Sequence, residues 1–334
     1  MPSSAVNRFA DPDRYFAGIR NLHIEGVVTK RGDFRVEATR IDLHRIWMHR
    51  FSENLPRIMR VMPSGERCLI LFGTDPSQAT MQISGIETSR GQFTILGLDW
   101  PYYLRSSTAC AWATMSLTPE DLTAASEAII GRPLAPPSFP YLTSPPGALA
   151  SRLSQLHQAT GHLAKTAPDI LSKPEVARAI EEVMVEMMVL CLAEGHSSEQ
   201  RNAHRHRATI MRRLEETLEA VPEKPLYMPE LCAAVGASYT SLHDCCRAYL
   251  GMSPKRYLWL RRMNLARRAL NSANGEGTSV TEIATNCGFW ELGRFAVAYR
   301  TLFGELPSAA LHRSRKDPEP AEIMLPAWRF VKSA

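Results

Sequence analysis

An internal repeat in the last third of the chain constrains the fold more than any other feature. The segment that begins at Leu231 returns at Ile283, and Gly288 follows Gly236 by 52 residues. The apolar and turn residues beyond these glycines are all offset by 53, which one inserted residue explains. A repeat of this kind predicts two similar structural units. The matching residues are Leu242, Cys246, Gly251 and Pro254 in the first copy, and Phe295, Tyr299, Gly304 and Pro307 in the second.

Each copy has the pattern of a helix-turn-helix unit. A short helix, expected at 228–235 and again at 280–287, ends at a glycine that can take the left-handed conformation of a tight turn. Ser238 is a natural N-cap for the second helix of the first unit, and Trp290 and Glu291 lie near the start of its counterpart. Apolar residues four apart share one buried face, so the rest of each second helix turns outward. We call these second helices the recognition helices.

A helix expected at 254–270 connects the two units. About 16 helical residues span ~24 Å, so the outward faces come within reach of adjacent major grooves ~34 Å apart. Its apolar residues can pack against both units while its five arginines stay largely polar, and these are Arg256, Arg261, Arg262, Arg267 and Arg268.

Charge is concentrated in the same region. The chain carries a net charge of +5, and residues 226–316 hold twelve Lys or Arg against six Asp or Glu, so this segment alone carries +6. A basic segment joined to a nearly neutral one indicates contact with a polyanion, most simply nucleic acid, although a solvated charged surface is the alternative. No apolar stretch reaches the ~20 residues of a membrane span, and no secretion signal is evident, so we expect a cytoplasmic protein.

The front of the chain has a different character. Short β-prone runs between residues 34 and 117 predict a small sandwich or barrel. Thr118 and Pro119 then start a helix that runs to about Ile130. Two apolar stripes at helical spacing follow, within 149–163 and 176–191, and we interpret them as a dimer seam in preference to packing against the β domain.

The repeat and its surroundings resemble the DNA-binding domain of the AraC/XylS family of transcription regulators. The resemblance covers about residues 207–312 and rests on 251–258, 262–270, 280–289 and the aromatic and glycine positions up to Pro307. It implies a transcription regulator, most often an activator that contacts RNA polymerase. It also implies an N-terminal effector-binding and dimerisation domain, often a cupin-like barrel.

We therefore expect an α+β protein with an N-terminal small β-barrel or cupin-like domain with flanking helices, and a C-terminal all-α double helix-turn-helix domain. The expected segments are an effector-sensing domain (1–145), a helical dimerisation segment (146–196), a linker (197–206), the DNA-binding domain (207–316) and a tail (317–334). The expected partners are double-stranded DNA, RNA polymerase, a small-molecule effector and a second copy of the chain.

Carried over residue by residue, the resemblance assigns DNA contacts to both recognition helices. Asp244 stands where the family usually has a basic residue, and it can accept a hydrogen bond from a cytosine amino group or act within the protein. Arg294 either reads a guanine or clamps a phosphate. Gly293 either lets the helix approach DNA closely or makes room for Trp290. The predicted contacts are Tyr239, Thr240, His243, Asp244, Arg247, Glu291, Leu292, Gly293, Arg294 and Val297.

Aromatic residues crowd the predicted β domain. They either form its core or line an effector pocket, and the candidate effector residues are Trp47, Trp100, Tyr102, Tyr103 and Trp112. His44 and His49 are five apart in a strand-like run and so face opposite sides, which predicts neither a metal site nor a cofactor. The alternative function is a DNA-binding protein with an enzymatic N-terminal domain, either of cupin type or with Cys68 or Cys110 as a group-transfer nucleophile.

Overall fold

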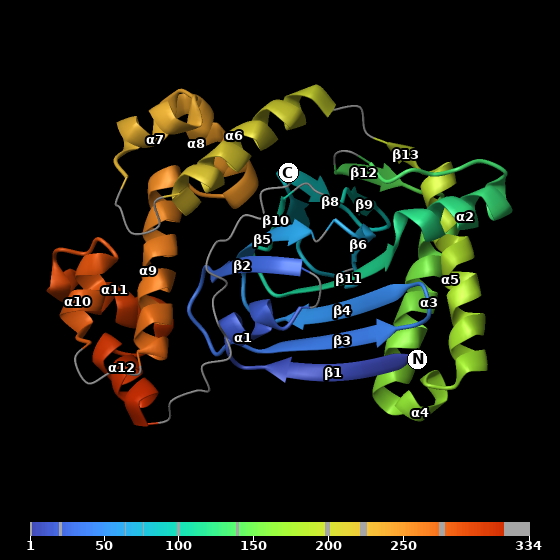
Figure 1. Ribbon diagram of the computed structural model, residues 1–334, viewed down its shortest axis with the longest axis horizontal. Coiled ribbons are helices and arrows are strands. Elements are labelled where there is room, and N and C mark those ends of the chain that lie inside the picture. Colours follow the sequence, from blue (N-terminus) through green and yellow to red (C-terminus); the bar gives the residue numbers. More distant parts are fainter. Residues whose placement is uncertain are drawn as a thin grey trace, which may run out of the picture.

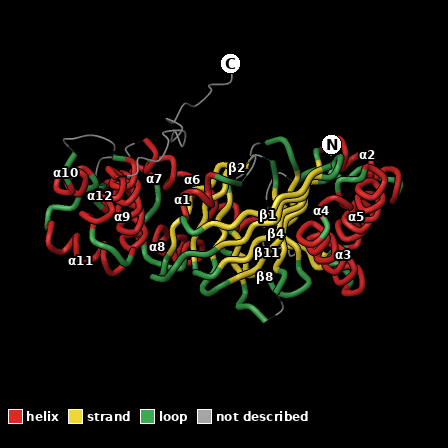
Figure 2. Tube along the Cα trace, turned by 90° about the horizontal axis from the view of Figure 1, so that it is seen from below, coloured by secondary structure: helices red, strands yellow, loops and turns green. Residues whose placement is uncertain are grey.

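Two β-sheets form the middle of the molecule, with helices at both ends (Figures 1 and 2). The helices at one end come from the middle of the chain, and those at the other end come from the last third. This computed structural model describes residues 2–19, 22–63, 65–75, 77–98, 101–137, 140–197, 201–220, 226–273 and 278–316.

The larger sheet has eight strands and the smaller has five, and all the pairs described are antiparallel. The larger runs in the order β1 (Ser3–Phe9), β3 (Val36–Asp42), β4 (Trp47–Glu53), β11 (Cys110–Leu117), β6 (Cys68–Gly73), β9 (Phe93–Leu96), β12 (Tyr141–Ser144), β13 (His196–Ser197). The smaller runs in the order β2 (Leu22–Val28), β5 (Arg57–Pro63), β10 (Tyr102–Arg105), β7 (Met81–Ile83), β8 (Ile86–Thr88).

The larger sheet is buried on both faces. Alternating residues of its central strands point to opposite sides: Met48 and Met115 pack beneath helices, whereas Phe51 and Trp112 pack between the two sheets. The α+β class is therefore as expected. The closed barrel is not, because across the described strands each sheet keeps two open ends and the second sheet covers one face of the first.

The helices of the middle of the chain cover the outer face of the larger sheet. Thr118 caps α2 through the backbone N–H of Asp121, as its sequence predicts. The apolar stripes of α3 and α5, including Leu153, Met184 and Met188, lie fully buried in the core of this same chain. Packing against the sheet thus explains the pattern that we interpreted as a dimer seam. These helices are α2 (Pro119–Ile130), α3 (Gly147–Thr166), α4 (Pro168–Leu171) and α5 (Pro174–Glu194), and a short α1 (Pro12–Ala17) precedes β2.

The last third of the chain is helical. Its first helix, α6, begins at Arg201, inside the segment expected to be a linker. Among the described residues, no helix is long and apolar enough to cross a membrane. The helices are α6 (Arg201–Ala220), α7 (Met228–Val235), α8 (Tyr239–Leu250), α9 (Pro254–Ser272), α10 (Val280–Asn286), α11 (Leu292–Phe303) and α12 (Pro307–Lys316).

A buried histidine fixes α3 to the larger sheet. The Nδ1 atom of His157 accepts a hydrogen bond from the Arg50 guanidinium at 3.0 Å, so its Nε2–H is left to donate to the Thr114 carbonyl at 3.2 Å. Burial, together with the charge of Arg50, lowers the pKa of His157 to about 3. The imidazole is therefore neutral in the folded protein at neutral and mildly acidic pH.

We predict that His157 makes stability depend on pH. Its pKa is about 3 when folded, against about 6.5 in an unfolded chain. Between these values only the unfolded chain binds the proton, so stability is full above pH ~6.5 and falls as the pH drops. At pH 5 this costs about 2 kcal/mol of unfolding free energy.

Urea unfolding at pH 7 and pH 5 checks the prediction. The His157→Gln variant should lose about 2 kcal/mol less than the parent protein between the two pH values. His162→Gln is the matched control, because His162 is exposed on the same helix. If His157→Gln lost as much unfolding free energy between pH 7 and pH 5 as the parent protein, the pH dependence would not come from His157.

Candidate DNA-binding surface

The first helix-turn-helix unit consists of α7 and α8, with the bounds of α7 as expected. Gly236 adopts the left-handed conformation, with φ 67°, and its N–H closes the end of α7. The Ser238 side chain then caps α8 by accepting from the N–H of Ser241. Leu242 and Cys246 are fully buried against α6 and α7, so they orient the opposite face of α8 toward solvent.

That outward face carries the predicted DNA contacts of the first unit. Tyr239, Thr240, Asp244 and Arg247 are exposed, whereas His243 is half-buried. The Nδ1 atom of His243 lies 3.6 Å from an Asp244 carboxylate oxygen. Asp244 therefore has a neighbour within the protein and is also accessible to a base.

The second unit, α10 and α11, repeats this arrangement. Gly288 makes the turn with φ 77°, and α11 packs through an aromatic series in which Phe289 lies 4.9 Å from Phe295 and Tyr299 lies 4.6 Å from Phe303, measured between ring centroids. A larger apolar core replaces the leucine and cysteine of the first unit. The recognition helix is positioned by the same two buried positions, 295 and 299, that the repeat predicts.

The predicted contacts on α11 are all exposed: Glu291, Leu292, Gly293, Arg294 and Val297. Arg294 forms an exposed ion pair with Glu291, with Nε and Oε2 2.8 Å apart. A Cβ placed on Gly293 would meet no atom within 4 Å. The idea that this glycine makes room for Trp290 is therefore wrong, and close approach to DNA remains the prediction.

Trp290 is a further exposed residue beside the second recognition helix that sequence reasoning did not assign. Its side chain is 73% exposed, two residues before α11 begins. A tryptophan that precedes a recognition helix by two residues, in a copy whose counterpart position is small, is the signal that could have found it.

The connecting helix α9 keeps less basic charge exposed than expected. Arg261 pairs with the buried Glu215 at 2.8 Å, and Arg267 pairs with Asp11 at 2.9 Å. Arg268 lies 3.5 Å from Asp13. These arginines form ion pairs with other parts of the chain. The positive charge of residues 226–316 is therefore divided between internal ion pairs and the outer surface.

The candidate effector residues divide between two places. Trp47, Tyr102 and Trp112 line a cavity between the two sheets that is partly open to solvent. Tyr103 points to the opposite face of the same strand and contacts α6 and α8. Trp100 lies outside the described residues.

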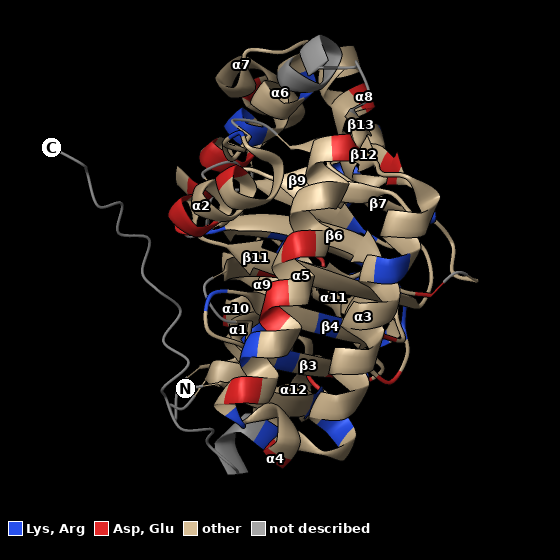
Figure 3. Ribbon diagram, turned by 90° about the vertical axis from the view of Figure 1, so that its right-hand side faces the viewer, with Lys and Arg blue, Asp and Glu red and all other residues tan. Residues whose placement is uncertain are grey.

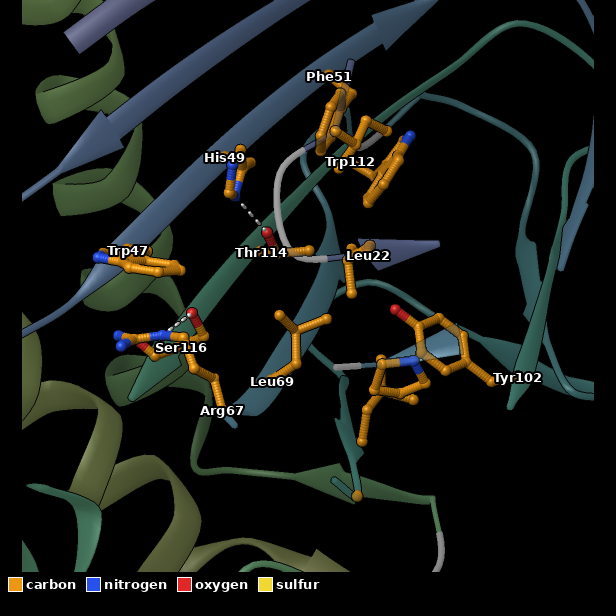
Figure 4. A pocket seen from close by; sticks show the side chains of 14 residues that line it. Leu22, Trp47, His49, Phe51, Arg67, Leu69, Tyr102, Trp112, Thr114 and Ser116 are labelled. Carbon is orange, nitrogen blue, oxygen red and sulfur yellow. Dashed lines mark hydrogen bonds between the residues drawn. The ribbon is translucent and has the colours of Figure 1, made fainter. Parts of the chain in front are cut away.

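The floor of this cavity is built from three pairs of residues across β4 and β11. Trp47 lies opposite Ser116, His49 opposite Thr114, and Phe51 opposite Trp112; Figure 4 shows these side chains around the cavity. The cavity-facing residues are spaced two apart on each strand, and sequence reasoning missed this signal. Phe51 and Trp112 stack with their centroids 4.1 Å apart.

Polar groups gather at one end of the cavity. The Arg67 guanidinium lies over the Trp47 ring at 4.0 Å from the centroid, and its Nε donates to the Ser116 hydroxyl at 3.0 Å. Thr114 and His49 lie beside them, 3.4 Å apart. Trp112 closes the opposite end, where its indole N–H donates to the buried Glu53 carboxylate at 2.8 Å. Across the described lining there is no carboxylate side chain.

Comparison with known proteins identifies the helical region. Residues 231–313 match the helix-turn-helix domain family. The chain is 34% identical over 105 residues to the XylDLEGF operon transcriptional activator of Pseudomonas putida, a match that covers 31% of this chain and 33% of that protein. It is also 34% identical over 149 residues to the probable thc operon regulatory protein of Rhodococcus erythropolis, covering 42% of this chain and 45% of that protein.

Among solved structures, the AraC-like transcriptional activator CuxR aligns with a TM-score of 0.42 and 16% identity, covering 80% of this chain and 95% of that one. A similarity at that level carries no functional argument. The matched part of each of these two relatives is less than half of its length. Within it, the sequence and the paired recognition helices define a helix-turn-helix DNA-binding domain. In this domain the chain is similar to these transcription regulators, as its resemblance to the AraC/XylS family implies.

We predict that the Arg294→Ala substitution shows whether this side chain reads a base or binds a phosphate. If it reads guanine, Arg294→Ala should weaken binding to the preferred DNA site by ~1–3 kcal/mol and relax preference at one base pair. If it clamps a phosphate, all sequences should weaken equally and the salt dependence should become shallower.

Titration of site variants at several salt concentrations separates the two results. Arg178→Ala is the matched control, because Arg178 forms a similar exposed pair with Glu182, at 3.1 Å, on the distant helix α5. No loss of affinity in Arg294→Ala would remove Arg294 from the DNA-binding surface.

Proposed function

We propose that this protein is a sequence-specific transcription regulator, a homodimeric activator whose binding to promoter DNA responds to a small-molecule effector. One observation carries the proposal: two recognition helices of the same fold expose their predicted contact residues and are joined by the single helix α9. Activation is proposed because the similar P. putida protein is a transcriptional activator, and RNA polymerase is then the protein partner. A cytoplasmic location follows from the DNA partner.

The surroundings of the two candidate nucleophiles favour a regulator over a group-transfer enzyme. Burial raises the pKa of the Cys68 thiol to about 12, and burial beside Glu53 does the same to Cys110. Because the thiolate is the reactive form, neither cysteine is activated for transfer at neutral pH.

Sequencing of the DNA fragments that the purified protein retains tests the proposal. We expect the retained fragments to share two short sequence elements centred about 10 base pairs apart, because two linked recognition helices enter adjacent major grooves on one side of the duplex. Genes beside the retained fragments would indicate the regulated pathway. Retention without any shared sequence would contradict specific regulation, and no retention at modest ionic strength would contradict DNA binding altogether.

The cavity between the sheets is our candidate effector site. Its walls are aromatic and aliphatic, and its polar end holds one guanidinium and no described carboxylate. An apolar molecule would gain from burial against the rings of Trp47, Phe51 and Trp112. An acidic group would lie at Arg67, Ser116 and Thr114, whereas a cation would meet the Arg67 charge. We therefore propose an apolar, ring-sized molecule with one acidic group as the effector class.

We predict that the fluorescent probe anilinonaphthalene sulfonate, an apolar acid of this class, binds saturably to the cavity. Leu69→Trp places an indole among the lining residues and should abolish the fluorescence gain, because it fills the space. Leu306→Trp is the control, because Leu306 is exposed in the DNA-binding domain. Undiminished probe binding in Leu69→Trp would place the probe elsewhere and contradict the site.

Dimerisation remains part of the proposal. The buried stripe of α5 is occupied within the chain, so a second copy would have to use outer residues such as Val183, which is 37% exposed. Both signs of charge border this face (Figure 3), among them Arg178 and Glu182 on α5. Sedimentation of the full chain with and without DNA measures the oligomeric state.

A further inference from the structure

Strand β10 has one face in the cavity and the other against the DNA-binding domain. Successive residues of a strand point to opposite faces. Tyr102 lines the cavity, and Tyr103 crosses to the other side, where its ring meets Tyr249 of α8 edge-on at 5.7 Å between centroids. The neighbouring β7–β8 turn also approaches α8 closely, since a Cβ on Gly85 would lie 3.2 Å from the Tyr249 ring.

A single buried carboxylate holds this contact together. Glu215 of α6 has no exposed surface. One of its oxygens accepts hydrogen bonds from the hydroxyls of Tyr103 and Tyr257, both at 2.8 Å, and the other accepts from Arg261 at 2.8 Å. Glu215 therefore connects β10, α6 and α9. One turn further along α6, Glu219 forms an ion pair with Arg60 of β5, the strand beside β10.

The far half of α9 is attached to the N-terminal domain independently. Arg267 pairs with Asp11, the N-cap residue of α1, at 2.9 Å, and Arg268 lies 3.5 Å from Asp13. Helix α9 packs against both helix-turn-helix units. The contacts of α9 with Glu215 and with α1 therefore fix the position of both recognition helices relative to the sheets.

We propose that β10 transmits occupancy of the cavity to the DNA-binding domain through the Tyr103–Glu215 hydrogen bond. A molecule that fills the cavity presses on Tyr102, and the rigid strand carries the shift to Tyr103 on its other face. The hydrogen bonds that Glu215 accepts from Tyr103, Tyr257 and Arg261 then weaken, so α6 and α9 are held less firmly. The first recognition helix is then free to adjust to DNA. This inference rests on the proposed effector site.

The geometry favours β10 as the route because one of its residues, Tyr102, lines the cavity and the next, Tyr103, contacts α6 and α8. Trp47, Phe51 and Trp112 also face the cavity, but the other faces of their strands pack beneath α3 and α5. A shift of those strands would reach the middle helices. In the described part of the structure, the adjacent residues Tyr102 and Tyr103 of β10 place the cavity within one residue of the contacts to α6 and α8.

Hydrogen exchange of the full chain, with and without anilinonaphthalene sulfonate, tests the route. Saturating probe should speed exchange in α6 and the first half of α9 about tenfold in the parent protein, the change expected for loss of one hydrogen bond to a buried carboxylate. Tyr103→Phe should bind the probe within twofold of the parent, exchange faster in these helices without probe, and show no further change when probe is added.

Tyr299→Phe is the matched control. Tyr299 is a fully buried tyrosine of the second unit, and its hydroxyl has no hydrogen-bond partner in the described part of the structure. This variant should respond to probe as the parent does. Glu215→Gln, which keeps oxygen for the tyrosines but removes the charge opposite Arg261, should raise exchange in α9 even without probe.

The possible failures are distinguishable. Probe-dependent exchange that persists unchanged in Tyr103→Phe would overturn the route, as would probe bound in the cavity without any change in α6 or α9. Failure of the probe to bind at all would remove both the effector site and this route. DNA retention, measured separately on the same preparations, reports on the proposed regulator whatever the exchange shows.

Discussion

The attachment of the DNA-binding domain to the smaller sheet depends on a carboxylate that has no access to water. Burying the Glu215 charge is unfavourable unless its oxygens are satisfied by donors and an opposite charge. Tyr103 of β10 and Tyr257 and Arg261 of α9 supply those groups to Glu215 of α6, so three elements meet at this carboxylate. The domains are thus held by an interaction that fails if any one element moves away, which makes their relative position specific.

The positive charge of the last third serves two purposes. Arg247, Arg294 and Arg300 are exposed on the recognition helices, where they can meet a phosphate backbone. Arg261, Arg267 and Arg268 are turned toward acidic partners on α6 and α1. The same residue type positions the domain and is available to a polyanion, and only the location on the helix surface separates the two groups of arginines.

Local sequence predicted the helical region closely. Gly236 and Ser238 terminate and begin helices through contacts within a few residues, so α7 and α8 could be placed from sequence alone. The buried residues Phe295 and Tyr299 of α11 could also be predicted, because residues four apart lie on the same face of a helix. The front half was predicted less well. The stripe around Met184 indicates only that one face must be covered, and it carries no information on whether a sheet or a second chain covers it.

The sequence by itself determined the two helix-turn-helix units, their family and the residues that their recognition helices expose, because capping, turn geometry and helical periodicity act over short distances. Tertiary structure alone decided that the two sheets stay open, that Tyr102 and Tyr103 face different sites, and that Arg267 and Arg268 of α9 pair with the N-terminal domain. Those outcomes depend on which strands and helices pack together, often across more than a hundred residues of sequence. Contacts at that range produce no periodic pattern in the sequence.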